Sequence, residues 1–289
     1  MGLFDWFRKK DVVPSPAAAA PPSHEPAVRR FGFERERMFD LGRTDLLAQL
    51  FATPRDQRER DWSDRFFDAA WWGSVELSQP QIFSGPDGFP YLRLNVPRPE
   101  TAFDSQCLGN LARDCLKNGV GAAFFASPDD GPEAAQFVLS FGLIDSLVRY
   151  DSPDGDPIDV AESAGGPDSS AFEVEKGLWS QTLVATEAQE VLVGTPSADF
   201  LPPHAAAALA RHLEQQWGLA DARVQLMANP KMRPHRSLVI GRKRSEFPEG
   251  APIDDMARAL LWYLTPARSI ILMPEEWELA QMTPLRELS

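Results

Sequence analysis

The spacing of apolar residues along the chain predicts amphipathic helices alternating with short strands. In the first half, residues 41–51 carry apolar side chains at helical spacing, and so does the run from Trp62 to Trp72. Thr53 and Pro54 supply the N-cap and the first residue that the second helix needs. The pattern therefore predicts two consecutive helices, with the tryptophans of the second in the protein core.

Further elements follow in the same half. The expected elements are strands at 81–83 and 91–96, a helix from 104 to 119, and strands at 120–126 and 137–150. Residues 85–88, Gly-Pro-Asp-Gly, are a strong turn signal between the first two strands. Asp104 is the expected helix cap and Gly119 its end. Gly142 predicts a bulge or break in the last strand.

The C-terminal hundred residues show a more regular alternation. The expected elements are strands at 190–194, 223–228, 237–242 and 269–273, and helices at 203–217 and 254–264. This βαββαβ order is compatible with a split-βαβ, two-layer sandwich. Residues 274–279 are expected to form a short acidic helix. The predicted fold class is α/β (α+β), with mixed sheets and helices packed on them.

Composition divides the chain into five parts. They are an apolar and cationic segment at 1–10, a proline- and alanine-rich linker at 11–30, an α/β subdomain at 31–150, an acidic insert at 151–185 and a C-terminal subdomain at 186–289. We expect the linker to be extended and disordered, so that the first ten residues form a flexible N-terminal arm.

Two sets of short stretches carry a resemblance to a known family. The N-terminal set is Leu46-Leu47, Thr53-Pro54, Arg58, Phe66-Phe67 and the turn and strand of 87–91. The C-terminal set is the strand at 190–194, Leu201-Pro202-Pro203 with the helix after it, and the strand at 237–241. In layout and hydrophobic pattern these stretches resemble bacterial SseB-type (enhanced serine sensitivity) proteins. The resemblance implies a bacterial cytoplasmic protein with a non-catalytic role, and it brings no catalytic residues.

The cysteines and histidines do not stand at catalytic or metal-binding spacing. Cys107 and Cys115 are eight residues apart, roughly 12 Å along a helix, which is too far for a disulfide. We expect both to be buried thiols. His204 and His212 are two helical turns apart, whereas metal ligands on a helix lie one turn apart.

Other cofactor and nucleophile motifs are missing from the sequence as well. Asp151 and Glu162 have the separation of the end ligands of an EF-hand loop, but Pro153 and Gly155 stand where carboxylates are needed. The chain has neither a Walker A motif nor a G-x-S-x-G motif. We therefore expect no metal, no cofactor and no enzymatic activity.

The first ten residues are the leading candidate for a binding segment. The anchor residues are Leu3, Phe4, Trp6, Phe7, Arg8, Lys9 and Lys10. Bulky apolar side chains followed by cations are typical of an interfacial segment on an anionic membrane. The same pattern suits an apolar groove on a partner protein or on the body of this chain, and the sequence leaves these three alternatives open.

Two charged stretches are further candidates. The net charge is −13, and residues 151–175 contain eight carboxylates with no lysine or arginine. The eight carboxylates predict a solvated loop that could bind a basic partner through Asp151, Asp154, Asp156 and Asp159. A basic stretch, Lys231, Arg233, His235 and Arg236, could bind an anionic partner, meet the acidic insert or protect a strand edge. The acidic balance disfavours nucleic-acid binding.

These features together predict a non-catalytic interaction protein. Its N-terminal segment would tether it loosely to the inner face of the bacterial membrane or to a protein partner, while the body stays cytoplasmic. The alternative is an acidic inhibitor, similar to a toxin-immunity protein, that blocks a basic enzyme.

Overall fold

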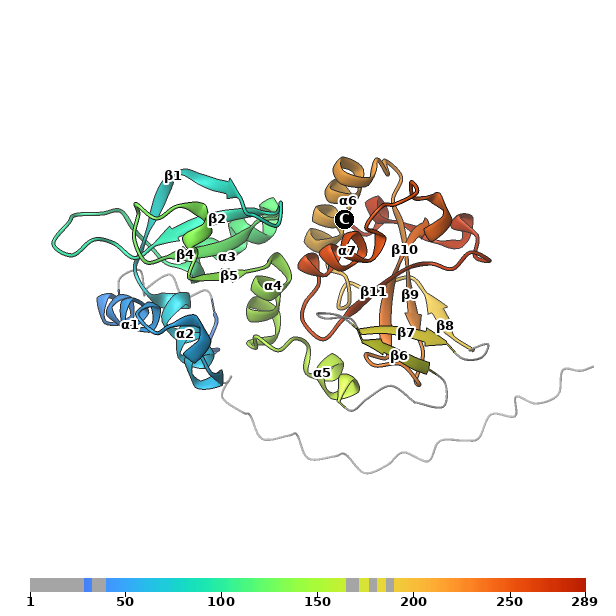
Figure 1. The fold of residues 1–289 in the computed structure, drawn as a ribbon, viewed down its shortest axis with the longest axis horizontal. Helices are drawn as coiled ribbons and strands as arrows, with labels where there is room; N and C mark the ends of the chain where they lie inside the picture. The colour runs from blue at the N-terminus through green and yellow to red at the C-terminus, as the bar shows by residue number, and fades with distance from the viewer. Residues whose placement is uncertain (1–28, 33–39, 165–171, 177–180, 186–189) are drawn as a thin grey trace, which may run out of the picture.

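The computed structural model describes residues 29–32, 40–164, 172–176, 181–185 and 190–289. The anchor residues 3–10 and almost all of the expected linker lie outside the described residues. Two mixed sheets with helices packed on them, and a separate two-stranded antiparallel sheet of residues 172–176 and 181–185, form the described part, which confirms the predicted α/β class (Figure 1).

The first sheet has the strand order β3-β1-β2-β4-β5, and the second has the order β11-β10-β9-β12, with β8 also paired to β9. The helices are α1 Leu41–Phe51, α2 Arg60–Trp72, α3 Leu108–Asn118, α4 Phe141–Tyr150, α5 Pro157–Ser163, α6 Pro203–Trp217 and α7 Ile253–Ala259. The strands of the first sheet are β1 Val75–Ser84, β2 Pro90–Asn95, β3 Ser105–Gln106, β4 Gly121–Phe125 and β5 Phe137–Leu139. The later strands are β6 Phe172–Lys176, β7 Gln181–Ala185, β8 Leu192–Gly194, β9 Arg223–Ala228, β10 Arg236–Lys243, β11 Ser269–Met273 and β12 Thr283–Pro284.

The helix α2 begins later than its cap signal predicts. Pro54 is followed by a single 3-10 turn, Arg55–Gln57, and the backbone is extended at Arg58 before α2 starts. The Arg58 side chain donates to the carbonyl oxygens of Thr53, at 3.0 Å, and Gln136, at 2.7 Å. The contact with Gln136 is long-range, and it accompanies the break in helix between Pro54 and α2. The local sequence does not reveal this break.

The helix α3 also begins later than predicted. Ser105 and Gln106 form the short strand β3 against β1, and Cys107 is the N-cap in place of Asp104. Gly119 ends the helix as predicted, in the left-handed conformation with φ 71°.

The prediction of a strand over residues 137–150 is wrong beyond Leu139. Ser140 caps a helix at this point, because its hydroxyl accepts from the amide of Leu143 at 3.1 Å. Gly142 therefore lies in α4, where a Cβ atom would stand 1.8 Å from the carbonyl oxygen of Leu264. This glycine permits a close helix–loop approach and does not mark a bulge.

The C-terminal part has the predicted βαββαβ order, but its strands pair differently from a split-βαβ sheet. Strand β10 pairs with β9 antiparallel and with β11 parallel, whereas β8 pairs with β9 at the opposite side of the sheet. A split-βαβ sheet would place the first strand of the set next to the last one. Because β8 pairs with β9, the strands β8, β9, β10 and β11 lie side by side in their sequence order.

The predicted acidic helix at 274–279 is not present. The chain leaves β11 without helix, and a short 3-10 turn follows at Leu279–Gln281. Glu275 is held by Ser245, whose amide and hydroxyl donate to its carboxylate at 3.1 and 2.7 Å. Ser245 lies 30 residues earlier in the chain.

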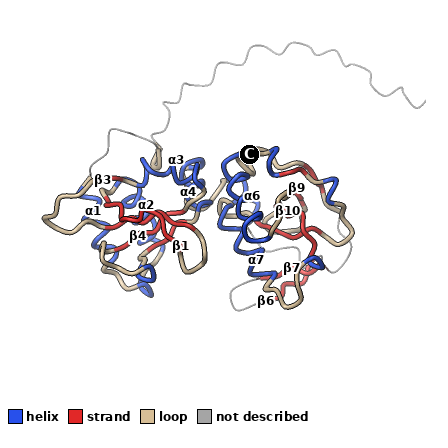
Figure 2. The backbone as a smooth tube through the Cα atoms, turned by 90° about the horizontal axis from the view of Figure 1, so that it is seen from above, coloured by secondary structure: helices blue, strands red, loops and turns tan. Residues whose placement is uncertain are grey.

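One hydrophobic core extends from the first sheet to the second. Phe89 and Trp262 stack with centroids 4.5 Å apart, and Trp262 Nε1 donates to the Tyr91 hydroxyl at 2.8 Å. Helices α4 and α6 lie between the sheets (Figure 2), and His204 Nε2 is 2.7 Å from Asp145 Oδ1 there. The two halves of the chain therefore share a packed, hydrogen-bonded interface.

Candidate functional site

Strand β11 forms one edge of the second sheet. It pairs with β10 in parallel from Ser237↔Ser269 to Ile240↔Leu272, and within the described part of the chain it pairs with no other strand. An edge strand presents backbone N–H and C=O groups on its unpaired side. These groups can accept a further strand.

A groove with a volume of about 680 Å³ runs along this edge. It is lined by residues of β11 and its flanks, of α7 and the turn after it, and of the loop before β10: Arg268–Glu275, Asp254, Ala257, Arg258, Leu261, Met232, Arg233, Pro234 and Arg244. Helix α7 contacts one face of β11, while Met232 and Ile271 belong to the apolar cluster on the other face. The groove is therefore bordered by apolar groups on both sides of the strand edge.

Charged groups flank the groove at its two ends. Arg233 belongs to the loop before β10, so it lies at the Ser269 end of the parallel pair, where its guanidinium donates to the carbonyls of Pro230 and Met232 at 2.7 Å. Glu275 follows Met273 at the opposite end. The Glu275 carboxylate accepts from Ser245, and Lys243 donates to the Glu275 carbonyl. The other charged residues of the lining form ion pairs: Arg244 with Asp254, Arg258 with Asp255 and Arg268 with Asp159.

A buried ion-pair cluster holds the start of β11. Arg268 Nε lies 2.6 Å from Asp159 Oδ2, and both side chains are 2% exposed. The Arg268 guanidinium also donates to the Tyr150 hydroxyl at 3.0 Å and to the carbonyl of Phe200. These contacts fix helix α5 and the residue that precedes the edge strand relative to each other.

The same cluster changes the interpretation of the acidic insert. The prediction of a solvated loop is wrong for the described residues 151–164. Asp159 is buried with Arg268, and Asp156 caps α5 by accepting from the amide of Ile158 at 2.9 Å. Asp151 accepts from the amides of Arg30 and Phe31 at 2.9 and 2.6 Å. Asp154 is exposed.

Part of the basic stretch meets this acidic segment, one of the alternatives raised by the sequence. Arg236 contacts Asp159 at 2.5 Å and Glu162 at 3.2 Å, and His235 Nδ1 lies 4.0 Å from Glu162. Arg233 instead borders the groove, and Lys231 lies beside Asn229, whose side chain accepts from its amide at 2.9 Å.

Neither cysteine is an activated thiol, and the described residues form no candidate metal site. Burial raises the pKa of Cys115 to about 12 and also raises the pKa of Cys107, so both thiols are protonated at neutral pH. Burial lowers the pKa of His212, which lies 3.1 Å from the Tyr263 hydroxyl. Within these residues no group of three histidine, cysteine or acidic side chains is placed to hold a metal ion.

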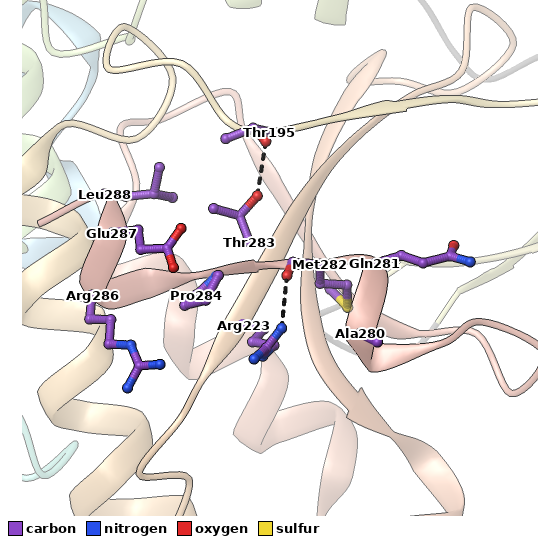
Figure 3. Close-up of a pocket in the computed structure, with 10 residues that line it drawn as sticks. All are labelled: Thr195, Arg223, Ala280, Gln281, Met282, Thr283, Pro284, Arg286, Glu287 and Leu288. Atoms are coloured by element: carbon purple, nitrogen blue, oxygen red, sulfur yellow. Dashed lines mark hydrogen bonds between the residues drawn. The ribbon is translucent and has the colours of Figure 1, made fainter.

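A second pocket, of about 520 Å³, lies beside β12 and the end of the chain (Figure 3). The hydroxyls of Thr195 and Thr283 face each other at 2.9 Å. Arg223 donates to the carbonyl of Met282 at 3.3 Å, and both Arg223 and Arg286 pair with Asp221. These polar groups already form hydrogen bonds and ion pairs with one another. The pocket therefore presents fewer unpaired polar groups to a ligand than the open edge of β11 does.

Comparisons with protein-family models, with curated proteins and with solved structures found no match to this chain. The resemblance to SseB-type proteins therefore stays a hypothesis. In the part of the chain that the structure describes, no helix is long and apolar enough to cross a membrane.

The sequence predicted the strand at 269–273 but not the groove beside it. A run of five residues with an apolar centre, Ser-Ile-Ile-Leu-Met, identifies a strand. Which side of that strand stays unpaired depends on strand order and on what α7 and the loop at 232–234 leave open. No local signal in the sequence carries that information.

Proposed function

We propose that this chain is a non-catalytic interaction protein that binds an extended segment of a protein partner along β11. The observation that carries the proposal is the unpaired edge of β11 at the base of an apolar groove. Addition of a strand to an open sheet edge is a common mode of peptide recognition, in which backbone hydrogen bonds supply affinity and side-chain pockets supply specificity.

The lining indicates the chemistry of the partner segment. Leu261, which is 37% exposed, and Met232 border the groove and favour apolar side chains at alternating positions of an added strand. Arg233 at one end favours an anionic group, and Glu275 at the other end favours a cationic group. The preferred segment is thus extended, apolar at its centre and oppositely charged at its ends.

The internal contacts of three of the four acidic residues favour this proposal over an acidic inhibitor. Asp151, Asp156 and Asp159 are engaged by groups of the chain itself, so they are not free to contact a basic enzyme. The two cysteines are buried free thiols, which supports a reducing compartment such as the bacterial cytoplasm. The protonated thiols also support a non-catalytic role.

The test uses peptides displayed as a library of random dodecapeptides and selected on the full-length protein. Synthetic copies of the selected peptides are then titrated against Leu261→Asp, with Leu279→Asp as the matched control. Leu279 is 42% exposed and lies outside the groove. We expect Leu261→Asp to weaken binding at least about tenfold, which corresponds to about 1.4 kcal/mol, and the control to bind as the unaltered chain does.

Two results would overturn the proposal. One is the failure of the library to yield any binding peptide both on the full-length protein and on its variant Phe4→Ser, Trp6→Ser and Phe7→Ser. The other is a set of peptides whose affinity is the same for Leu261→Asp and Leu279→Asp, because their site would then lie elsewhere.

A further inference from the structure

We infer that the β11 groove is occupied by the chain's own residues 1–10, so that a partner must displace them. This inference rests on the proposed function, because it needs a groove that accepts extended segments. Its occupant is the segment Met-Gly-Leu-Phe-Asp-Trp-Phe-Arg-Lys-Lys.

The described chain begins against the end of α4. Arg29 Nη2 donates to the carbonyl of Val148 at 2.5 Å, and the amides of Arg30 and Phe31 donate to Asp151. Phe31 is fully buried, so these contacts anchor the start of the body on the end of α4.

The end of α4 in turn contacts the start of β11. Tyr150 precedes Asp151, and its hydroxyl accepts from Arg268 Nη2 at 3.0 Å. Arg268 is the residue before β11 and lines the groove. Two contacts therefore connect the first described residues to the Ser269 end of the groove.

The intervening chain is long enough to place the segment along the whole groove. Residues 11–28 separate the segment from Arg29. At roughly 3 Å per residue they reach up to about 55 Å, whereas a strand of five residues is only about 17 Å long. The segment can reach either end of β11 and lie in either direction.

The apolar residues of the segment fit the composition of the groove. The segment places Leu3, Phe4, Trp6 and Phe7 within five positions. The groove is bordered by Leu261 and Met232 and includes the partly buried apolar residues of β11. Burial of such side chains against these groups removes apolar surface of both from water.

Charge selects the direction of the segment. Its cations Arg8, Lys9 and Lys10 follow the apolar residues, as Glu275 follows Met273 in β11. Parallel pairing places the cations at the end that holds the carboxylates of Glu275, Glu276 and Asp254. Two cations of the body, Lys243 and Arg244, lie at the same end, so the carboxylates there outnumber them by one. Antiparallel pairing would place the same cations beside Arg233. Parallel pairing is therefore favoured.

Because residues 1–10 are covalently attached to the body, they can occupy the groove even if their intrinsic affinity for it is weak. A segment on a short linker has an effective concentration in the millimolar range. A contact with a dissociation constant of about 0.1 mM would then be about 90% formed, and a free partner segment would have to compete with it. Release of residues 1–10 would expose the groove.

Hydrogen–deuterium exchange of the full chain tests the inference. We compare the unaltered chain with the triple variant Phe4→Ser, Trp6→Ser and Phe7→Ser, using Val12→Ser with Val13→Ser as the matched control. We expect exchange of the β11 amides to become about tenfold faster in the triple variant and to stay unchanged in the control. Exchange in β4 should be the same in all three proteins, which verifies that the body stays folded.

The direction of the segment has its own test. Glu275→Lys should speed exchange of the β11 amides, and the added substitution Lys9→Glu should slow it again. Unchanged exchange of β11 in the triple variant would overturn the inference. So would protection of β11 that rises with protein concentration, since a second copy would then be the occupant.

A membrane surface is the alternative binding site of residues 1–10, and the same proteins distinguish it from the groove. If the triple variant loses binding to vesicles of phosphatidylcholine and phosphatidylserine while β11 exchange is unchanged, the segment is a membrane anchor and the inference is wrong. Library peptides separate the two proposals. If they bind the triple variant although its β11 exchange is unchanged, only the inference fails, whereas if they bind neither protein, the proposed function fails as well.

Discussion

Arg268 and Asp159 form an ion pair in which both side chains are 2% exposed, with Nε 2.6 Å from Oδ2. The pair joins helix α5 to the residue that precedes the edge strand β11. A buried ion pair gains its attraction only by removing both charges from water, so its members depend on each other. Loss of one partner leaves the other charge buried without compensation.

Asp159→Asn should consequently destabilise the protein by about 3–5 kcal/mol. Urea unfolding followed by circular dichroism measures this change. The matched control is Asp154→Asn, an exposed carboxylate five residues earlier, which should change the free energy of unfolding by less than about 0.5 kcal/mol. Equal effects of the two substitutions would show that the buried pair does not support the fold.

Gly142→Ala should destabilise the protein by about 3 kcal/mol or more, because its Cβ atom would stand 1.8 Å from the carbonyl oxygen of Leu264 and force α4 away from that loop. Gly131→Ala is the control, since a Cβ atom there meets nothing within 4 Å and φ is −70°. Thermal unfolding compares the two. A Gly142→Ala variant as stable as Gly131→Ala would contradict the close contact.

The buried side chain of His212 should make the folded protein less stable in mild acid. Burial against Phe89 and Tyr263 lowers its pKa in the folded state, so the unfolded chain binds the proton more readily. Its contribution to the free energy of unfolding is full above the unfolded pKa of about 6.5, and it is lost as the pH falls from there to the lowered folded pKa.

Measurements of unfolding free energy between pH 8 and pH 5 test this expectation. His212→Gln should remove part of the decrease below about pH 6.5. An identical pH dependence of the unaltered chain and His212→Gln would rule out His212 as a source of the decrease.

Trp262 and Tyr91 should be energetically coupled, because the indole donates to the tyrosine hydroxyl at 2.8 Å across the interface between the two halves. A double-mutant cycle with Trp262→Phe and Tyr91→Phe should give a coupling energy of about 0.5–1.5 kcal/mol. Chemical unfolding of the four proteins measures it. Additive effects would show that the hydrogen bond does not stabilise the interface.

Local patterns were sufficient for the elements whose signals lie within a few residues. The predicted bounds 41–51, 203–217, 223–228 and 269–273 are those of α1, α6, β9 and β11. Helical and strand periodicity is a property of neighbouring residues, and Gly119 and Gly218 end their helices because left-handed backbone favours glycine.

The acidic insert could not be interpreted in the same way. Asp151, Asp156 and Asp159 belong to a stretch that reads as a solvated loop, because eight carboxylates without a local cation give that pattern. The residue that buries Asp159, Arg268, is 109 positions away along the chain. Only the folded chain brings the two charges together.

By itself, the sequence determined the α/β class, the order of most elements and the positions of several helix ends, since these follow from short-range periodicity and backbone conformation. The tertiary structure decided which strand edge is open, which carboxylates are buried and why residue 142 is glycine. Each of these depends on groups distant in sequence, such as Leu264 beside Gly142, and contact between distant groups is a property of packing that no local pattern encodes.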